Sequence, residues 1–210
     1  RDGRTAALTR ARLVPLAYLG LALLWLWPLT LHPTAFAYPP GVEYSDLTIS
    51  HWPNAFFLRR SLTEFHQIPL WNPDQLGGQP FAADPLSGLW YPPNWLLALP
   101  FVPLTLGFNL LFVLHLAWAG WGLYLFVRAL PKVPPGAAFF GGLAFSGASK
   151  LAAHVGAGHV SLVFAVCWTP WLLLAVHRAD TFRRGALAGA VLAVVFLADP
   201  RGMPMAGLLG

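Results

Sequence analysis

Five stretches of mostly apolar residues dominate this chain and restrict the folds that it can adopt. They cover approximately residues 13–31, 104–127, 135–149, 160–176 and 185–198. A transmembrane helix needs about 20 mostly apolar residues. The third stretch is short and rich in Gly and Ala, which predicts a broken or tilted helix. The chain is 57% hydrophobic and only 10% charged, whereas soluble domains carry roughly 25% charged residues. The sequence therefore predicts an all-α, polytopic membrane protein.

The basic residues indicate which side of a membrane each connection faces. They precede the first stretch and lie between the second and third and between the fourth and fifth, so alternating spans put them all on one side. Cytoplasmic loops carry the Lys and Arg excess. We therefore expect a cytoplasmic N-terminus and an extracytoplasmic loop 32–100, which holds two Arg and five carboxylates, a net charge of −3. The basic residues used here are Arg4, Arg10, Arg12, Arg128, Lys132, Arg178, Arg183 and Arg184.

The remaining composition excludes several classes of partner. The formal net charge of +5 does not indicate nucleic acid, because the basic residues lie at the ends of apolar segments and not in a patch with stacking aromatics. Cys167 is the single cysteine, which excludes an intrachain disulfide and a cysteine-based metal site. The chain begins at Arg1 and ends at Gly210 inside an apolar stretch, so we interpret residues 1–210 as the N-terminal part of a single membrane domain.

The loop 32–100 is the part of the chain in which we expect function. It is far longer than an ordinary connection, and long loops are usually functional or disordered. Its aromatic and apolar runs argue against disorder. Leu58, Leu62 and Phe65 recur at helical spacing, which predicts a helix over 53–67 lying in the interface plane, with its apolar face toward lipid or toward the spans. The run 95–102 follows two prolines and predicts a re-entrant or interfacial piece.

Two carboxylates in this loop are candidate catalytic groups. Asp46 lies just before the predicted interfacial helix, where a carboxylate can stay ionised near a helix N-terminus. It could deprotonate an acceptor hydroxyl or hold a divalent cation, and the alternative is a helix cap or a solvated loop charge. Asp84 precedes Pro85, a pair that is also typical of a turn. Two carboxylates that converge on one pocket would suit acid–base or metal chemistry.

Several cationic and imidazole side chains are candidate substrate-binding groups. Arg59 and Arg60 could clamp a phosphate, because the planar guanidinium matches phosphate oxygens; the alternative is contact between an interfacial helix and lipid headgroups. Lys150, His154 and His159 cluster between the third and fourth stretches. Lys150 and His154 would share a helical face. The sequence has no H-E-x-x-H frame, which argues against a zinc site.

The motifs of the loop resemble the YfhO-like bacterial membrane protein family, which belongs with the GT-C glycosyltransferases. The resemblance rests on Asp46, the Arg59–Arg60 pair and a series of short motifs that follow them. It extends less specifically to Ala-Phe-Ser-Gly at 144–147 and Trp-Thr-Pro-Trp at 168–171. The main motifs are Pro-Leu-Trp-Asn-Pro at 69–73, Gly-Gln-Pro at 78–80, Ala-Asp at 83–84 and Tyr-Pro at 91–92.

The resemblance implies a GT-C-like transmembrane helix bundle in the bacterial plasma membrane, with catalysis in the outer loop. It implies an inverting sugar transfer from a polyprenyl-phosphate donor to a glycan or lipid acceptor of the cell envelope. Asp46 would be the base or the ligand of a divalent cation, and Asp84 a second active-site carboxylate. Arg201, Lys150 or Arg59 would face the donor phosphate. One departure is the sequence Ala-Asp-Pro-Arg at 198–201, where the family often has a Gly-His-Pro-Gln-like motif.

Two other functions remain open from the sequence. A transporter or flippase of lipid-linked glycans would place polar groups near the bilayer midplane and interrupt its spans. The Gly pairs of the third stretch fit that alternative, whereas the gathering of polar groups in the loop favours the enzyme. A non-catalytic membrane assembly protein would tolerate the loss of Asp46.

Overall fold

The chain is all-helical in the part that the structure, a computed structural model, describes: residues 2–27, 29–36 and 45–201, with side chains from Leu13 onward. The α-helices are α1 (Asp2–Trp25), α2 (Trp52–Thr63), α3 (Leu104–Ala129), α4 (Pro135–Ser146), α5 (Ser149–Ala157), α6 (Val160–His177) and α7 (Phe182–Ala198). Shorter helical segments lie between α1 and α3: η1 (Leu47–His51), η2 (Phe81–Ala83), η3 (Pro85–Ser87) and η4 (Pro92–Ala98). The predicted all-α class is therefore confirmed.

Two of these helices, α3 and α6, are long and apolar enough to cross a membrane, judged by length and composition. The other predicted spans are shorter as helices. The apolar part of α1 covers Leu13–Trp25, and α7 has 17 residues. The third predicted span, 135–149, is divided between α4, which has 12 residues, and α5, which begins at Ser149. This division supports the predicted break in the third stretch.

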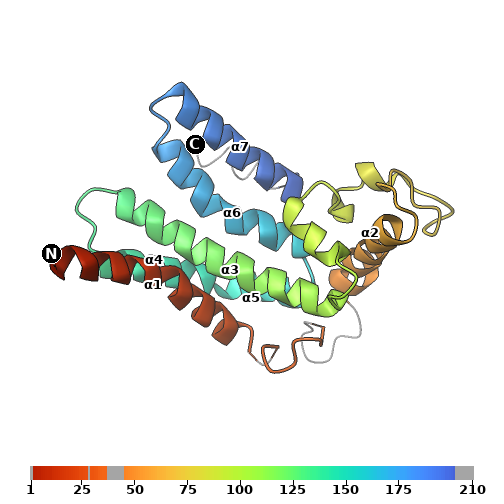
Figure 1. Cartoon of the computed structure of the whole chain (residues 1–210), viewed down its shortest axis with the longest axis horizontal. Helices are drawn as coiled ribbons and strands as arrows, with labels where there is room; N and C mark the ends of the chain where they lie inside the picture. The colour runs from red at the N-terminus through yellow and green to blue at the C-terminus, as the bar shows by residue number, and fades with distance from the viewer. Residues whose placement is uncertain (1, 28, 37–44, 202–210) are drawn as a thin grey trace.

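The bundle is built around α3 (Figure 1). Helices α1 and α4 pack on one side of α3, α6 packs on the other, and α7 packs against α6. Gly120 of α3 and Gly142 of α4 allow the closest approach, because a Cβ at Gly142 would lie 2.4 Å from the Gly120 carbonyl oxygen. Tyr18 of α1 fills the space beside them and donates a hydrogen bond to the Phe139 carbonyl at 2.9 Å.

A buried polar network joins the long loop to α3 and α6. The Tyr91 hydroxyl lies 2.5 Å from His115 Nε2, and Trp168 Nε1 donates to the same hydroxyl oxygen at 2.7 Å. His115 Nδ1 lies 2.6 Å from the Leu111 carbonyl, which can only accept, so Nδ1 carries the proton and Nε2 accepts from Tyr91. Every polar atom of this network has a partner, which is the condition for burying such groups at low cost.

The loop segments gather at one end of the bundle, and the α3–α4 and α6–α7 connections with their basic residues lie at the other (Figure 1). Helix α2 ends at Thr63 and not at the predicted residue 67, because the backbone turns to positive φ at His66. Its apolar face packs on the loop itself: Phe57 and Leu58 form a small core with Phe81 and Leu89. The predicted segment 95–102 contains the end of η4, whose Leu97 is buried.

Candidate functional site

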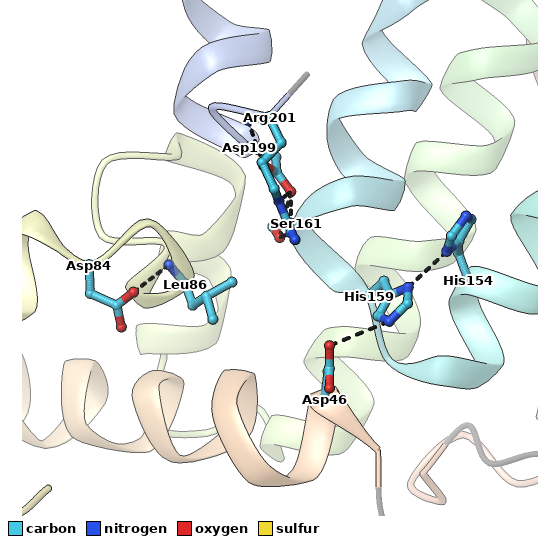
Figure 2. A network of polar contacts seen from close by, with 8 residues as sticks. All are labelled: Asp46, Asp84, Leu86, His154, His159, Ser161, Asp199 and Arg201. Carbon is cyan, nitrogen blue, oxygen red and sulfur yellow. Dashed lines mark hydrogen bonds and ion pairs between the residues drawn. The ribbon is translucent and has the colours of Figure 1, made fainter. Parts of the chain in front are cut away.

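Three carboxylates from distant parts of the sequence lie at the loop end of the bundle, each with its own polar contacts (Figure 2). Asp46 precedes η1, Asp84 lies between η2 and η3, and Asp199 follows α7. All three are close enough to the buried His51 side chain to act on its charge. Asp46 and Asp84, the two carboxylates predicted from the sequence, therefore both lie within electrostatic range of His51, and Asp199 is a third carboxylate in that range.

Asp46 is held beside a pair of histidines. Its Oδ2 lies 3.4 Å from His159 Nε2, and His159 Nδ1 lies 2.8 Å from His154 Nδ1 (Figure 2). One nitrogen of the Nδ1 pair must donate and the other accept. If His159 donates from Nδ1, its Nε2 carries no proton and can take one from Asp46, while His154 accepts at Nδ1. The chain of contacts then gives the Asp46 carboxylate a route for exchanging a proton with the surface.

Gly158 sets this contact by bringing the α5–α6 turn against the segment that carries Asp46. Its φ of +79° is in the left-handed region, and an added Cβ would lie 2.4 Å from the Leu47 backbone nitrogen. Glycine is the residue that adopts this conformation without steric cost. The sequence predicts a cluster of Lys150, His154 and His159 but not its proximity to Asp46, because the two segments are over 100 positions apart in the chain.

Asp199 and Arg201 form an ion pair that also lies near His51. Arg201 donates from Nε and NH2 to both oxygens of Asp199, at 2.7–3.2 Å, and Ser161 Oγ donates to Asp199 Oδ2 at 3.0 Å. Burial would raise the pKa of the Asp199 carboxyl, but the hydrogen bonds and the charge of Arg201 hold this pKa below its usual value. Asp199 is 1% exposed, whereas the Arg201 side chain is 65% exposed. The buried carboxylate thus fixes an arginine that can still meet a ligand.

Asp84 has a local structural task as well as its place near the site. Its Oδ1 accepts a hydrogen bond from the Leu86 backbone N–H at 2.9 Å and so caps η3 (Figure 2). Its Oδ2 accepts from Asn54 Nδ2 at 3.4 Å. The turn role expected for Asp before Pro is therefore present. In this turn the Asp84 carboxylate also lies within electrostatic range of His51.

His51 is the functional candidate that the sequence analysis missed. Its side chain is 8% exposed and makes no hydrogen bond or ion pair within the described residues. Burial lowers the pKa of its imidazole to about 4, although the nearby Asp46, Asp84 and Asp199 favour the charged form. The ring borders a small cavity of about 10 Å³, the size of one water site. Asn94 lines the same cavity, and its Oδ1 is buried without a partner.

Arg59 and Arg60, two of the other predicted binding residues, make their contacts away from this cluster. Arg59 donates from Nε to the Leu97 carbonyl at 2.8 Å and from NH2 to the Val102 carbonyl at 2.7 Å, so it ties α2 to the segment before α3. Arg60 pairs with Glu64 at 2.9 Å on the exposed side of α2. Lys150 is exposed on α5. Burial, His159 and Lys150 lower the pKa of the His154 imidazole.

The predicted metal site at Asp46 would need further ligands. Among the described residues no group of three His, Cys, Asp or Glu side chains is arranged to hold a metal ion. Asp46 has His159 as its neighbour of this kind, with 3.4 Å between Oδ2 and Nε2. We therefore assign no step to a metal.

The cluster has the chemical groups for proton transfer and for anion binding in one place. Neutral His51 can accept or donate a hydrogen bond, Asp46 can take a proton, and Arg201 offers donors that Asp199 does not occupy. Comparison of the chain with protein-family models finds no match, and comparison with curated proteins and with solved structures finds no significant match.

Proposed function

We propose that this chain is a membrane glycosyltransferase of the GT-C type, which moves a sugar from a polyprenyl-phosphate donor to an acceptor of the bacterial cell envelope. The observation that supports it most is that Asp46, Asp84, Asp199 and Arg201 all lie within electrostatic range of the buried His51. The resemblance of the loop motifs to YfhO-like proteins supplies the reaction class. A site at the ends of α6 and α7 suits a substrate whose head is polar and whose tail is lipid.

In the proposed reaction Asp46 takes the proton of the acceptor hydroxyl. The acceptor oxygen then bonds to the anomeric carbon of the sugar, and the bond from that carbon to the donor phosphate oxygen breaks. The phosphate leaves with the electron pair, and the exposed donors of Arg201 stabilise its charge. The anomeric configuration inverts, because the acceptor enters opposite to the leaving group. His159 and His154 carry the proton from Asp46 to the surface.

Asp199 and Ser161 act in this scheme by holding Arg201. A guanidinium with a bidentate carboxylate partner has a fixed orientation. Asp199 takes Nε and one terminal nitrogen of Arg201, and the other terminal nitrogen can donate to a phosphate. We therefore assign phosphate binding to Arg201 rather than to Arg59, whose guanidinium already donates to two backbone carbonyls.

The proposal is tested by a sugar-transfer assay with the protein in membranes or nanodiscs and a labelled polyprenyl-phosphate sugar. Asp46→Asn keeps the shape of the side chain and removes the base, so we expect turnover to fall by about 10²–10⁴. Glu64→Gln is the matched control, because Glu64 is an exposed loop carboxylate outside the cluster, and it should leave turnover unchanged. Wild-type turnover by Asp46→Asn would remove Asp46 from the mechanism.

One observation keeps a transporter or flippase as the second candidate function. The α4–α5 break at Gly147 and Ala148 divides the third apolar stretch, and transporters use discontinuous helices of this kind to bind substrate. The charged cluster, however, lies at helix ends and not halfway along the bundle (Figure 1). Movement of an intact lipid-linked glycan across vesicles without sugar transfer would favour this candidate over the enzyme.

A further inference from the structure

An apolar groove runs along the outer surface of α3 and α6 and is separate from the Asp46 cluster. One cavity of about 660 Å³ lies between α3, α6 and α7, and a second of about 330 Å³ lies between α3, α6 and the loop at Pro93. Trp118 and Trp168 line both. We call these two adjoining cavities together the tryptophan groove.

The wall of the tryptophan groove presents carbon faces rather than polar atoms. Trp118 and Trp171 stack with ring centroids 3.9 Å apart, and Trp168 packs edge-on against Trp118 at 5.3 Å. Trp171 Nε1 donates inward to the Trp118 carbonyl at 2.9 Å, and Trp168 Nε1 donates to Tyr91. The indole N–H groups of Trp168 and Trp171 are therefore engaged inside the protein, whereas Trp118 Nε1 is buried without a partner among the described residues. A flexible apolar chain suits such a wall, whereas a polar ligand would find few partners on it.

The end of the groove at the α6–α7 connection is cationic. Arg178 and Arg184 line the larger cavity there, and Arg183 is next in sequence. Arg184 is paired with Asp180 at 2.5 Å, which leaves this connection with three arginines and one carboxylate. The Arg178 guanidinium makes no ion pair within the described residues. The groove thus combines an apolar length with an anion-binding end.

We propose that the tryptophan groove binds an anionic glycerophospholipid, with one acyl chain along the tryptophans and the phosphate at Arg178 and Arg184. The groove lies on the two helices that are apolar enough to cross a membrane, so lipid is the solvent that would meet this face. From Arg178 back to Trp168 is about 15 Å along α6 at 1.5 Å per residue, and the smaller cavity continues toward Pro93. This length suits an extended acyl chain.

The charges decide which kind of lipid the groove prefers. A zwitterionic headgroup brings its own cation close to the arginines, whereas an anionic headgroup does not. Arg178 and Arg184 lie at the end of the bundle opposite to Asp46 and Arg201 (Figure 1). The lipid bound here is therefore distinct from the sugar donor, and this inference does not rest on the proposed function.

Native mass spectrometry of the whole chain tests the proposal, with phosphatidylglycerol and phosphatidylcholine of matched chains added in equal amounts. We expect one phosphatidylglycerol to be retained about tenfold more than phosphatidylcholine. Arg178→Gln combined with Arg184→Gln should abolish this preference. Arg183→Gln is the matched control, because Arg183 lies in the same connection but does not line the groove, and it should retain the preference.

A second pair of variants tests the apolar part of the groove. Leu187 lines it and is 59% exposed, so Leu187→Trp should fill the space and reduce retention of both lipids severalfold. Leu16→Trp, at a position of α1 that is 61% exposed, should have no effect. Equal retention of the two lipids by the unmodified chain, an unchanged preference in the double arginine variant, or undiminished binding by Leu187→Trp would overturn the proposal. A lipid-free dimer would do the same.

Discussion

Replacing Gly158 by Ala should displace the segment that carries Asp46 and destabilise the fold. The residue combines a φ of +79° with a close approach to the Leu47 backbone nitrogen, 2.4 Å from the position of the added Cβ. The conformation and the space are both unsuited to a side chain. Because the obstacle is backbone and not the end of a flexible side chain, the segment that carries Asp46 has to move.

The two effects give the magnitude. A non-glycine residue in the left-handed region costs about 1–2 kcal/mol, and overpacking of a tight contact costs about 1–3 kcal/mol. We expect Gly158→Ala to reduce the free energy of unfolding by about 2–5 kcal/mol. For a chain of this size 1 kcal/mol corresponds to about 2–4 °C, so the thermal midpoint should fall by about 4–20 °C.

Thermal unfolding in a mild detergent, followed by circular dichroism, measures this change. Gly141→Ala is the matched control, because a Cβ there would meet only Val127, at 4.0 Å, inside α4. Alanine is a better helix former than glycine by about 0.5–1 kcal/mol, so this variant should be as stable as the original chain or slightly more stable. Equal midpoints for Gly158→Ala and Gly141→Ala would show that the Asp46 segment does not pack on the α5–α6 turn.

Three further predictions follow from the site and its supports. Burial lowers the pKa of His51 from 6.5 to about 4, so the folded state binds fewer protons than the unfolded state between these pH values. The free energy of unfolding should therefore fall by up to about 3 kcal/mol as the pH drops from about 6.5 to 4. Urea titrations should show a smaller fall in His51→Gln. The lowered pKa of Asp199 stabilises the fold above about pH 4, and this stabilisation is lost as the pH falls through the folded-state pKa. Asp199→Asn should therefore unfold at a lower urea concentration than the original chain at pH 7. The difference between the two urea midpoints should shrink toward pH 3. Arg59→Gln removes two charge-assisted hydrogen bonds and should lower the free energy of unfolding by about 1.5–3 kcal/mol. Arg60 is exposed on α2, so Arg60→Gln should lower it by less than about 1 kcal/mol in the same denaturant measurement.

Much of the fold follows from the hydrophobic pattern of the sequence. The periodicity of Leu58, Leu62 and Phe65 predicts the helix that becomes α2, and the apolar stretches predict the helices of the bundle. The third stretch is broken, which is one of the two outcomes that its glycines predict, and the break lies at Gly147 and Ala148, where Gly147 packs against Trp25. The hydrophobic pattern does not predict which surface each apolar helix face packs against. The face of α2 is equally suited to lipid or to protein, and it packs on Phe81 and Leu89 because the loop folds back over it.

The sequence predicts only some residues of the site, because the others are of ordinary types at ordinary positions. Asp46, Asp84 and Arg201 are recognisable candidates, because charged groups are rare in this chain and these lie in the loop motifs or beside a span. His51 and Ser161 carry no such signal. A single histidine at the start of a helix and a serine in an apolar helix are ordinary, and they gain importance only when folding places them near the three carboxylates.

The two buried histidines of the described fold show how structural and functional polar groups differ here. His115 has a partner on each ring nitrogen, from Tyr91 and from the Leu111 carbonyl, so nothing further is needed to satisfy it. His51 is buried to a similar extent but has no hydrogen-bond partner, and it borders a water-sized cavity among three carboxylates. An unpaired buried polar group costs about 1–3 kcal/mol, and a ligand or water that paired with it would recover that free energy. Among the described residues other buried polar atoms also lack a partner, from Asn94 Oδ1 beside His51 to Asn109 Oδ1 and Trp118 Nε1 on α3, so His51 is distinguished by the three carboxylates near it and not by burial alone.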